Sequence, residues 1–307
     1  MNNKLTILII LIITFVSCRK VLDIELPSKE GKIVINSFFN NNEQLTINIS
    51  KSLHILDNIE SKLLNDAEVI VYENNIYKEQ LTNTSNGNYI ASFIPSKDKI
   101  YRVNVSYPDL KDAYSENIIP NPINIISVDT LTVYSSNSNG MNGEGNGSTN
   151  QYQLKIKFKD PDQIKNYYSF KIYLKNQINY FKNILNNDYY PLYFYSNDIV
   201  IESWQNNETA YFSDDFINGK EYELIINLDK YNFPNTDNEV IVELNSVSKD
   251  YFLYCKSYNL YQSVNGNPFS EPVQVYNNIE NGYGIFAGYS SDTLVLNLKG
   301  EIYYYVE

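Results

Sequence analysis

KIVINSFFNNNEQLTINIS, residues 32–50, decides the fold class of this chain. β-Branched and aromatic residues gather at both ends of the stretch, and three consecutive asparagines between them form a turn signal. A short strand followed by a turn then recurs along most of the chain at a spacing of roughly 8–12 residues, which is typical of an all-β architecture. The chain is therefore predicted to be mainly β.

The first predicted domain covers residues 32–120, and its strand spacing is that of an immunoglobulin-like β-sandwich. Residues 51–66 are predicted to be either a loop or a short helix. Pro120 and Pro122 mark the boundary at its end. The strands predicted for this domain are 32–39, 44–50, 67–73, 75–81, 87–93, 99–107 and 112–120.

The second predicted domain covers residues 121–307 and is again rich in strands, so a second β-sandwich-like unit is expected. Residues 135–150 consist mainly of Gly, Ser and Asn, which predicts a flexible insertion, or a loop that becomes ordered on a ligand. The strands predicted for this domain are 127–134, 151–160, 167–176, 190–196, 220–229, 238–247 and 291–307.

One stretch departs from the strand pattern: SKDYFLYCKSYNLYQSV, residues 248–264. Four tyrosines recur there at helical spacing, and Ser248 is suited to cap a helix N-terminus. We predict one amphipathic helix packed on the second sheet. The tyrosine stripe is interpreted as core packing, with a ligand-binding surface as the alternative, and Cys255 as a small core residue. The four tyrosines are Tyr251, Tyr254, Tyr258 and Tyr261.

The first 18 residues, MNNKLTILIILIITFVSC, are typical of a lipoprotein signal peptide. A positive Lys4 precedes an apolar run, and a small residue precedes Cys18. We therefore predict that residues 1–17 are removed and that Cys18 carries the lipid at the start of a tether over residues 18–31. The alternatives are a cleaved signal with an unlipidated cysteine and a transmembrane helix, which needs roughly 20 apolar residues.

The composition limits the possible partners. The chain has 307 residues, of which 43% are hydrophobic and 14% aromatic, enough to build sizeable cores. Its net charge of −12 disfavours nucleic acid and docking on anionic lipid through a basic face. Once Cys18 is lipidated, Cys255 is the remaining cysteine, so no disulfide is expected.

The residue types needed for common enzyme chemistry are scarce, and we predict no enzyme activity, cofactor or metal. His54 is the single histidine, which argues against Ser-His-Asp triads and His/Cys zinc sites. The acidic pairs Asp160/Asp162 and Asp214/Asp215 are interpreted as turns, with calcium ligands as the alternative. A hydrolase that uses two carboxylates is the remaining enzymatic hypothesis.

Three stretches of the second domain carry a family resemblance. The most specific is NGNPFSEPVQVYNNIENGYGIFAGYSS, residues 265–291, and residues 158–173 and 248–259 accompany it. Residues 18–39 fit the same pattern. Together they resemble the family catalogued as domain of unknown function 4249, over essentially the whole mature chain.

Within residues 265–291, glycines and X-Pro pairs predict a rigid corner that locks the helix onto the sheet, or a binding site built on that loop. Phe269, Ile285, Phe286 and Tyr289 are expected to fill the gap between helix and sheet. The residues chosen for this corner or binding loop are Pro268, Phe269, Glu271, Pro272, Asn278, Gly282, Gly284 and Phe286.

The resemblance implies a lipoprotein of the outer membrane of Gram-negative bacteria, associated with TonB-dependent receptors, and it implies no reaction or ligand. We expect a non-catalytic, lipid-anchored binding or accessory protein of a TonB-dependent transporter or of an outer-membrane assembly machinery, with an outer-membrane β-barrel protein as its partner. The alternative is an independent carbohydrate- or peptide-binding lipoprotein, in which exposed tyrosines and Trp204 stack on sugars. The sequence leaves open whether the protein faces the periplasm or the cell surface.

Overall fold

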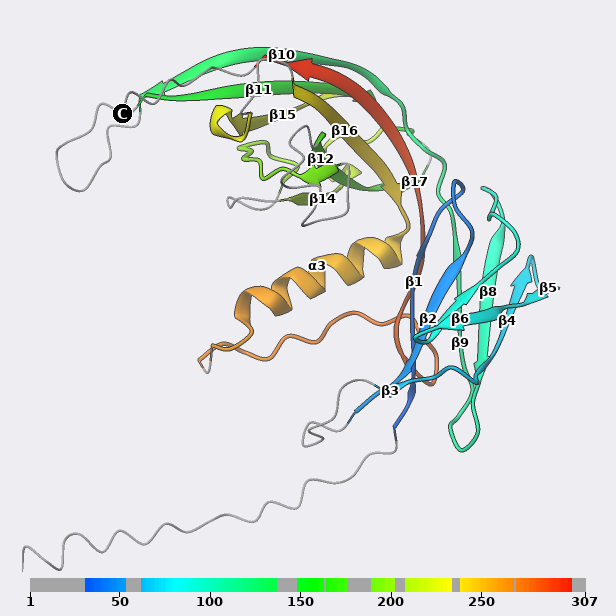
Figure 1. Cartoon of the computed structure of the whole chain (residues 1–307). Coiled ribbons are helices and arrows are strands. Elements are labelled where there is room, and N and C mark those ends of the chain that lie inside the picture. Colours follow the sequence, from blue (N-terminus) through cyan, green and yellow to red (C-terminus); the bar gives the residue numbers. More distant parts are fainter. Residues whose placement is uncertain are drawn as a thin grey trace, which may run out of the picture.

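The structure is a computed structural model of the chain. It describes residues 31–53, 62–136, 148–162, 164–175, 189–201, 208–233, 238–267 and 269–299. Within these ranges the fold is mainly β, with several sheets and one α-helix, as the sequence predicts (Figure 1). The strands are β1 (Ile33–Phe39), β2 (Thr46–Lys51), β3 (Lys62–Leu63), β4 (Glu68–Glu73), β5 (Ile76–Gln80), β6 (Thr82–Ser85), β7 (Asn88–Ile90), β8 (Ile100–Ser106), β9 (Ala113–Ile118), β10 (Ile125–Ser136), β11 (Ser148–Lys159), β12 (Tyr167–Lys175), β13 (Tyr189–Pro191), β14 (Thr209–Ser213), β15 (Glu221–Asp229), β16 (Asn238–Val247) and β17 (Tyr283–Leu298). The α-helix is α3 (Lys249–Val264), and two 3-10 helices are η1 (Asp214–Phe216) and η2 (Lys230–Asn232).

Three sheets are formed by the described strands. The largest has ten strands, in the order β13-β12-β16-β17-β1-β2-β7-β6, with β14 paired to β12 and β3 paired to β2. The other two have the orders β10-β11-β15 and β5-β4-β8-β9. The large sheet therefore contains strands from both the N-terminal and the C-terminal part of the chain. Each smaller sheet takes all its strands from one of these parts.

The first core lies among strands of the N-terminal part of the chain. β1 and β8 alternate buried and more exposed residues, as expected for strands that bury one face. Ile35 and Ile47 from the large sheet share this core with Val71 and Val103 from the β5-β4-β8-β9 sheet. Phe286, far along the chain, is also part of it.

The second core is formed by strands from Ile125 onward. Phe158 and Ile226 from the β10-β11-β15 sheet are fully buried together with Phe170 and Val242 from the large sheet. The predicted strands at residues 151–160, 167–176 and 238–247 thus match β11, β12 and β16 closely.

β17 joins the two cores, and its course corrects the sequence-based interpretation. It pairs in parallel with β1 between Val34/Tyr283 and Phe39/Gly288, and antiparallel with β16 beyond that point. Residues 283–290 are therefore strand, whereas the sequence predicts a glycine-rich corner there and a strand only from residue 291. The glycines are misleading here, because they permit close strand pairing as well as turns.

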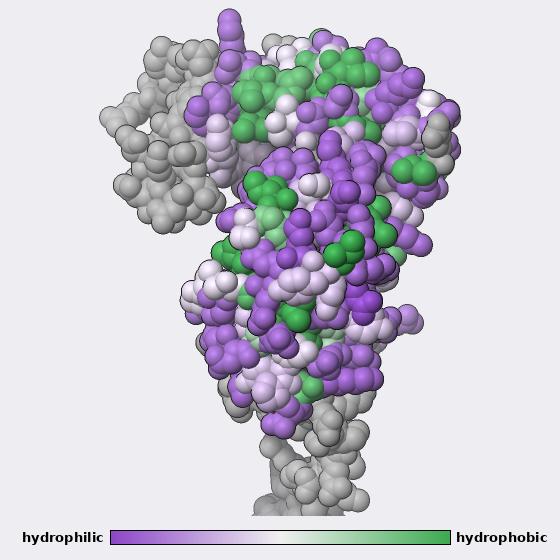
Figure 2. Space-filling view, turned by 90° about the vertical axis from the view of Figure 1, so that its right-hand side faces the viewer, coloured by the Kyte–Doolittle hydropathy of each residue, from purple (hydrophilic) through white to green (hydrophobic). Residues whose placement is uncertain are grey.

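Apolar side chains remain on the outside of the sheets as well. Figure 2 shows them gathered on the upper part of one face and more dispersed among hydrophilic residues lower down. Exposed apolar residues of β10 and β17 include Ile126, Leu131 and Val295. Single exposed residues of this kind are normal on β-proteins.

Candidate functional site

Helix α3 begins against the large sheet and ends away from β1 and β2 (Figure 1). The predicted cap is present, because the Ser248 hydroxyl accepts a hydrogen bond from the Tyr251 N–H at 3.3 Å. Beyond the helix, residues 265–282 run back along α3 and lead into β17 (Figure 1). Helix and return segment together form a two-limbed projection, which we call the α3 projection (residues 249–282).

The first half of α3 packs on the large sheet, as predicted. Tyr251, Phe252 and Cys255 are buried against β12, β14 and β17 in a third, smaller core. Phe38 of β1 contacts this core, with its ring 4.4 Å from that of Tyr251. Burial raises the pKa of the Cys255 thiol to about 11, so this cysteine is a core residue in the protonated form.

The second half of α3 does not follow the core interpretation of the tyrosine stripe. Tyr258 is 41% exposed and Tyr261 is 37% exposed, and Leu260 beside them is 54% exposed. The rings of Tyr254 and Tyr258 are stacked, with centroids 6.0 Å apart and planes 4° apart. The stripe therefore continues from the core onto the surface. We call its outer part, Tyr254, Tyr258 and Tyr261, the aromatic ridge.

The loop after α3 extends this apolar surface. Phe269 is 95% exposed, so it does not fill the gap between helix and sheet as expected. Glu271 and Pro272 are exposed too, and Pro268 lies outside the described residues. A phenylalanine with almost no protein contact is unusual, since its burial stabilises a fold by roughly 1.5–3 kcal/mol.

The remaining chosen residues have structural roles. Asn278 pairs through its side chain with the backbone of Phe286, and the Phe286 ring is fully buried against Phe39 at 4.6 Å. A side chain at Gly282 or Gly284 would collide with β1, at the carbonyl oxygens of Ile33 and Ile35. The family stretch thus divides into an exposed part before residue 273 and a packed part after residue 277.

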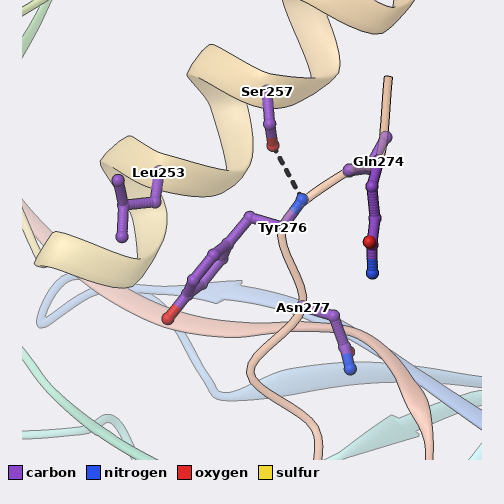
Figure 3. A pocket seen from close by; sticks show the side chains of 6 residues that line it. Leu253, Ser257, Gln274, Tyr276 and Asn277 are labelled. Carbon is purple, nitrogen blue, oxygen red and sulfur yellow. Dashed lines mark hydrogen bonds between the residues drawn. The ribbon is translucent and has the colours of Figure 1, made fainter. Parts of the chain in front are cut away.

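Between the two limbs lies an open groove of about 460 Å³. Leu253 and Ser257 line it from α3, and residues 274–277 line it from the return segment (Figure 3). The Tyr276 N–H donates a hydrogen bond to the Ser257 hydroxyl at 2.8 Å (Figure 3). This bond holds the return segment at a fixed distance from the middle of the helix.

A carboxylate secures the base of the projection. Asp250, in the first turn of α3, accepts a hydrogen bond from Asn117 of β9 at 2.6 Å and another from the Tyr276 hydroxyl at 2.5 Å. Burial, followed by the bond to Asp250, raises the pKa of Tyr276. Helix, return segment and N-terminal strands are therefore joined at one polar contact.

The outer part of the α3 projection, residues 257–278, carries little charge. From Ser257 to Asn278, Glu271 is the only charged residue, although the chain as a whole has a net charge of −12. Uncharged, aromatic surfaces of this kind are typical of the central part of protein interfaces.

The acidic pairs come together elsewhere, which the sequence did not predict. Asp160 is buried and accepts hydrogen bonds from the Tyr168 hydroxyl and the Gly219 N–H. Asp214 is buried too and forms an ion pair with Lys165 at 2.6 Å. Lys165 also pairs with Asp215, so a cation from the protein itself lies beside both carboxylates of the second pair. No group of three His, Cys, Asp or Glu suited to a metal ion occurs within the described ranges.

Several predicted residues cannot be located. Cys18 with its signal peptide and tether, His54, Trp204 and most of the 135–150 insertion lie outside the described residues. In the part of the chain that the structure describes, no helix is long and apolar enough to cross a membrane.

One comparison identifies the family of this chain. The model of a family described as "Domain of unknown function (DUF4249)" matches residues 19–294. No curated protein matches this chain.

Proposed function

The chain belongs to the DUF4249 family, and from this premise we propose that it is a non-catalytic, lipid-anchored binding or accessory protein of the outer membrane. In this proposal the α3 projection docks on a partner protein, which the family resemblance suggests is a TonB-dependent transporter or an outer-membrane assembly machinery. The partner is then an outer-membrane β-barrel protein.

The observation that carries the proposal is the exposure of Phe269, five residues after the end of α3, together with that of Tyr258 and Tyr261 on the helix. Aromatic side chains contribute most of the binding energy at many interfaces, provided that a partner buries them. The position on a projection held by Asp250 and Ser257 makes these side chains available without a rearrangement of either core.

The anchor in this proposal is a lipid on Cys18. The stretch from Cys18 to Gly31 spans at most about 47 Å when fully extended, which allows the folded part to reach a partner in the same membrane. Wild-type protein should incorporate a labelled fatty acid, and replacing Cys18 by Ser should abolish this incorporation. Equal labelling of the Cys18→Ser variant would contradict lipid anchoring at this residue.

The proposal includes a finer description of the architecture. We assign residues 32–120 to an immunoglobulin-like β-sandwich and residues 121–307 to a second β-sandwich-like domain that bears α3. Two sheets that share a core in each half support this division. β17 then belongs to the second domain and supplies Phe286 to the core of the first.

Affinity purification from membranes tests the docking. The full-length protein, extracted in mild detergent, should retain a large outer-membrane β-barrel protein that mass spectrometry identifies. The double variant Tyr258→Ala/Phe269→Ala should lose about tenfold or more of this binding, because two aromatic anchors are removed. The control Phe216→Ala removes another exposed phenylalanine, which lies outside the projection, and should bind normally. Recovery of the wild-type protein alone would contradict the proposal.

Carbohydrate binding is the second candidate, favoured by the exposed rings of Tyr258 and Tyr261. Tyrosine rings stack on the apolar faces of sugars. The purified protein should then bind glycans on an array, and the Tyr258→Ala variant should lose this binding. That result would support the alternative and count against a protein partner at the same surface.

A further inference from the structure

The return segment contains a short stretch that resembles a strand but has no strand beside it. Val273 and Val275 are half-buried and Gln274 between them is exposed, which is the period-two pattern of a strand that buries one face. The sequence Val-Gln-Val-Tyr favours the same conformation. Nevertheless, these residues have no place in any of the three sheets.

The backbone of this stretch is also without partners. Within the described residues, no hydrogen bond involves the N–H or C=O groups of Val273, Gln274 or Val275. By contrast, the Tyr276 N–H is bonded to Ser257, and the backbone around Asn278 and Glu280 is bonded to Ser115 and Tyr114. The segment is thus fixed at one end, and it offers free backbone donors and acceptors immediately before that point.

The residues that line the groove beside this stretch indicate which chemical class of ligand fits it. The groove of about 460 Å³ next to it has apolar walls at Leu253 and Val275 and uncharged polar groups at Ser257, Gln274 and Asn277. A lipid chain has no donors or acceptors for unpaired peptide groups, whereas an extended polypeptide supplies both at matching intervals.

We propose that the return segment is a docking strand: an extended, largely uncharged segment of the partner protein pairs with the backbone of residues 273–275, and its apolar side chains enter the groove beside Leu253. The proposal rests on the binding function proposed above and specifies the class of ligand as a polypeptide in β-conformation. Phe269 and the aromatic ridge then flank the added strand.

The test uses a displayed library of random peptides of about ten residues, enough to extend beyond the three-residue stretch on both sides. The full-length detergent-purified protein is the target, and hydrogen exchange of its amides is measured with and without a selected peptide. Selected peptides should be apolar at alternate positions and should slow exchange at Val273 to Val275. Failure to select any peptide, or protection confined to other segments, would overturn the inference.

Two variants at one position separate backbone from side-chain effects. Val275→Pro removes the backbone N–H and should weaken the selected peptide about tenfold, whereas Val275→Ala keeps the N–H and should bind nearly as the wild type. Equal binding of both variants contradicts strand pairing. If the proline variant does not fold, the exchange measurement on the wild type still decides.

The two proposals fail separately. Loss of the β-barrel partner in the Tyr258→Ala/Phe269→Ala variant concerns docking by the projection as a whole. Normal capture of that partner by a folded Val275→Pro variant would leave the docking function intact and reject strand addition.

Discussion

The side chain of Asn278 pairs with the backbone of Phe286 as a neighbouring strand would. Its Nδ2 donates to the Phe286 carbonyl at 2.8 Å, and its Oδ1 accepts from the Phe286 N–H at 3.0 Å. At this point β17 has β1 on its other side. The Asn278 side chain therefore supplies hydrogen-bond partners to the Phe286 N–H and C=O groups, on the side of β17 that faces away from β1.

Replacing Asn278 by Ala should destabilise the protein by about 2–3 kcal/mol, because a donor and an acceptor of a buried residue lose their partners. Equilibrium unfolding in urea measures the difference. The control Asn259→Ala removes an exposed amide of α3 and should change the free energy of unfolding by less than about 0.5 kcal/mol. Equal effects of the two variants would show that the Asn278 bonds contribute nothing specific.

Gly284→Ala should prevent correct pairing of β17 with β1. A Cβ at this position would lie 2.1 Å from the Ile35 carbonyl oxygen, and the residue has a φ of +111°. Either strands separate or the backbone changes conformation, and both changes disrupt the junction of the two cores. We expect little soluble, cooperatively unfolding protein in a thermal melt.

Gly266→Ala is the matched control, because Gly266 has a φ of +84° and no atom within 4 Å of an added Cβ. It tests backbone strain without the collision and should cost only about 1 kcal/mol. A Gly284→Ala variant as stable as the Gly266→Ala variant would refute the role assigned to close strand approach.

Local patterns predicted the elements that depend on neighbouring residues. The ten residues of β16 match the predicted range 238–247, and the sixteen residues of α3 begin at the predicted Ser248 cap and end at the predicted residue 264. β14, by contrast, is only five residues long and was missed. Its partner β12 is far away in sequence, and a short run carries too little pattern to identify a strand by itself.

The candidate site was harder to predict, because helical spacing identifies a face and not what covers it. Tyr251 and Tyr258 lie on the same stripe, yet the sheet reaches only the first. Likewise, hydrophobicity suggested burial of Phe269, and only the three-dimensional course of the return segment shows that it is exposed. The parallel pairing of β17 with β1 joins segments far apart in the sequence, Val34–Phe39 and Tyr283–Gly288, and no local signal specifies such a register.

Cys255 should react slowly with thiol reagents in the folded protein. Burial raises its pKa from 9.0 to about 11, so the reactive thiolate is about 100-fold rarer near neutral pH than in the unfolded chain. In a Cys18→Ser background, in which Cys255 is the only thiol, an aromatic disulfide reagent should react at least that much more slowly at pH 8 without urea than with it. Comparable rates would contradict a buried thiol.

The same shift predicts a pH dependence of stability. Because the folded pKa is the higher one, the contribution of Cys255 is fully present below pH 9 and is lost as the pH rises through about 11. The free-energy difference between the wild type and Cys255→Ala should therefore decrease by up to about 2–3 kcal/mol between these values. A difference that stays constant over this range would contradict the shift.

Asp250 should be energetically coupled to Tyr276, since the carboxylate accepts the tyrosine hydroxyl at 2.5 Å. In a double-mutant cycle of Asp250→Ala and Tyr276→Phe, the coupling measured by urea unfolding should be about 1–2 kcal/mol, as for a partly buried hydrogen bond to a charged group. The hydroxyl of Tyr283, by contrast, has no hydrogen bond among the described residues. Tyr283→Phe combined with Asp250→Ala should therefore give additive changes.

Tyr276→Phe should also speed amide exchange in residues 274–277 while leaving β16 unchanged, because the bond holds only the return segment. If exchange in β16 rose as well, Tyr276 would stabilise the second core, and the α3 projection could not be treated as a separate element built on it.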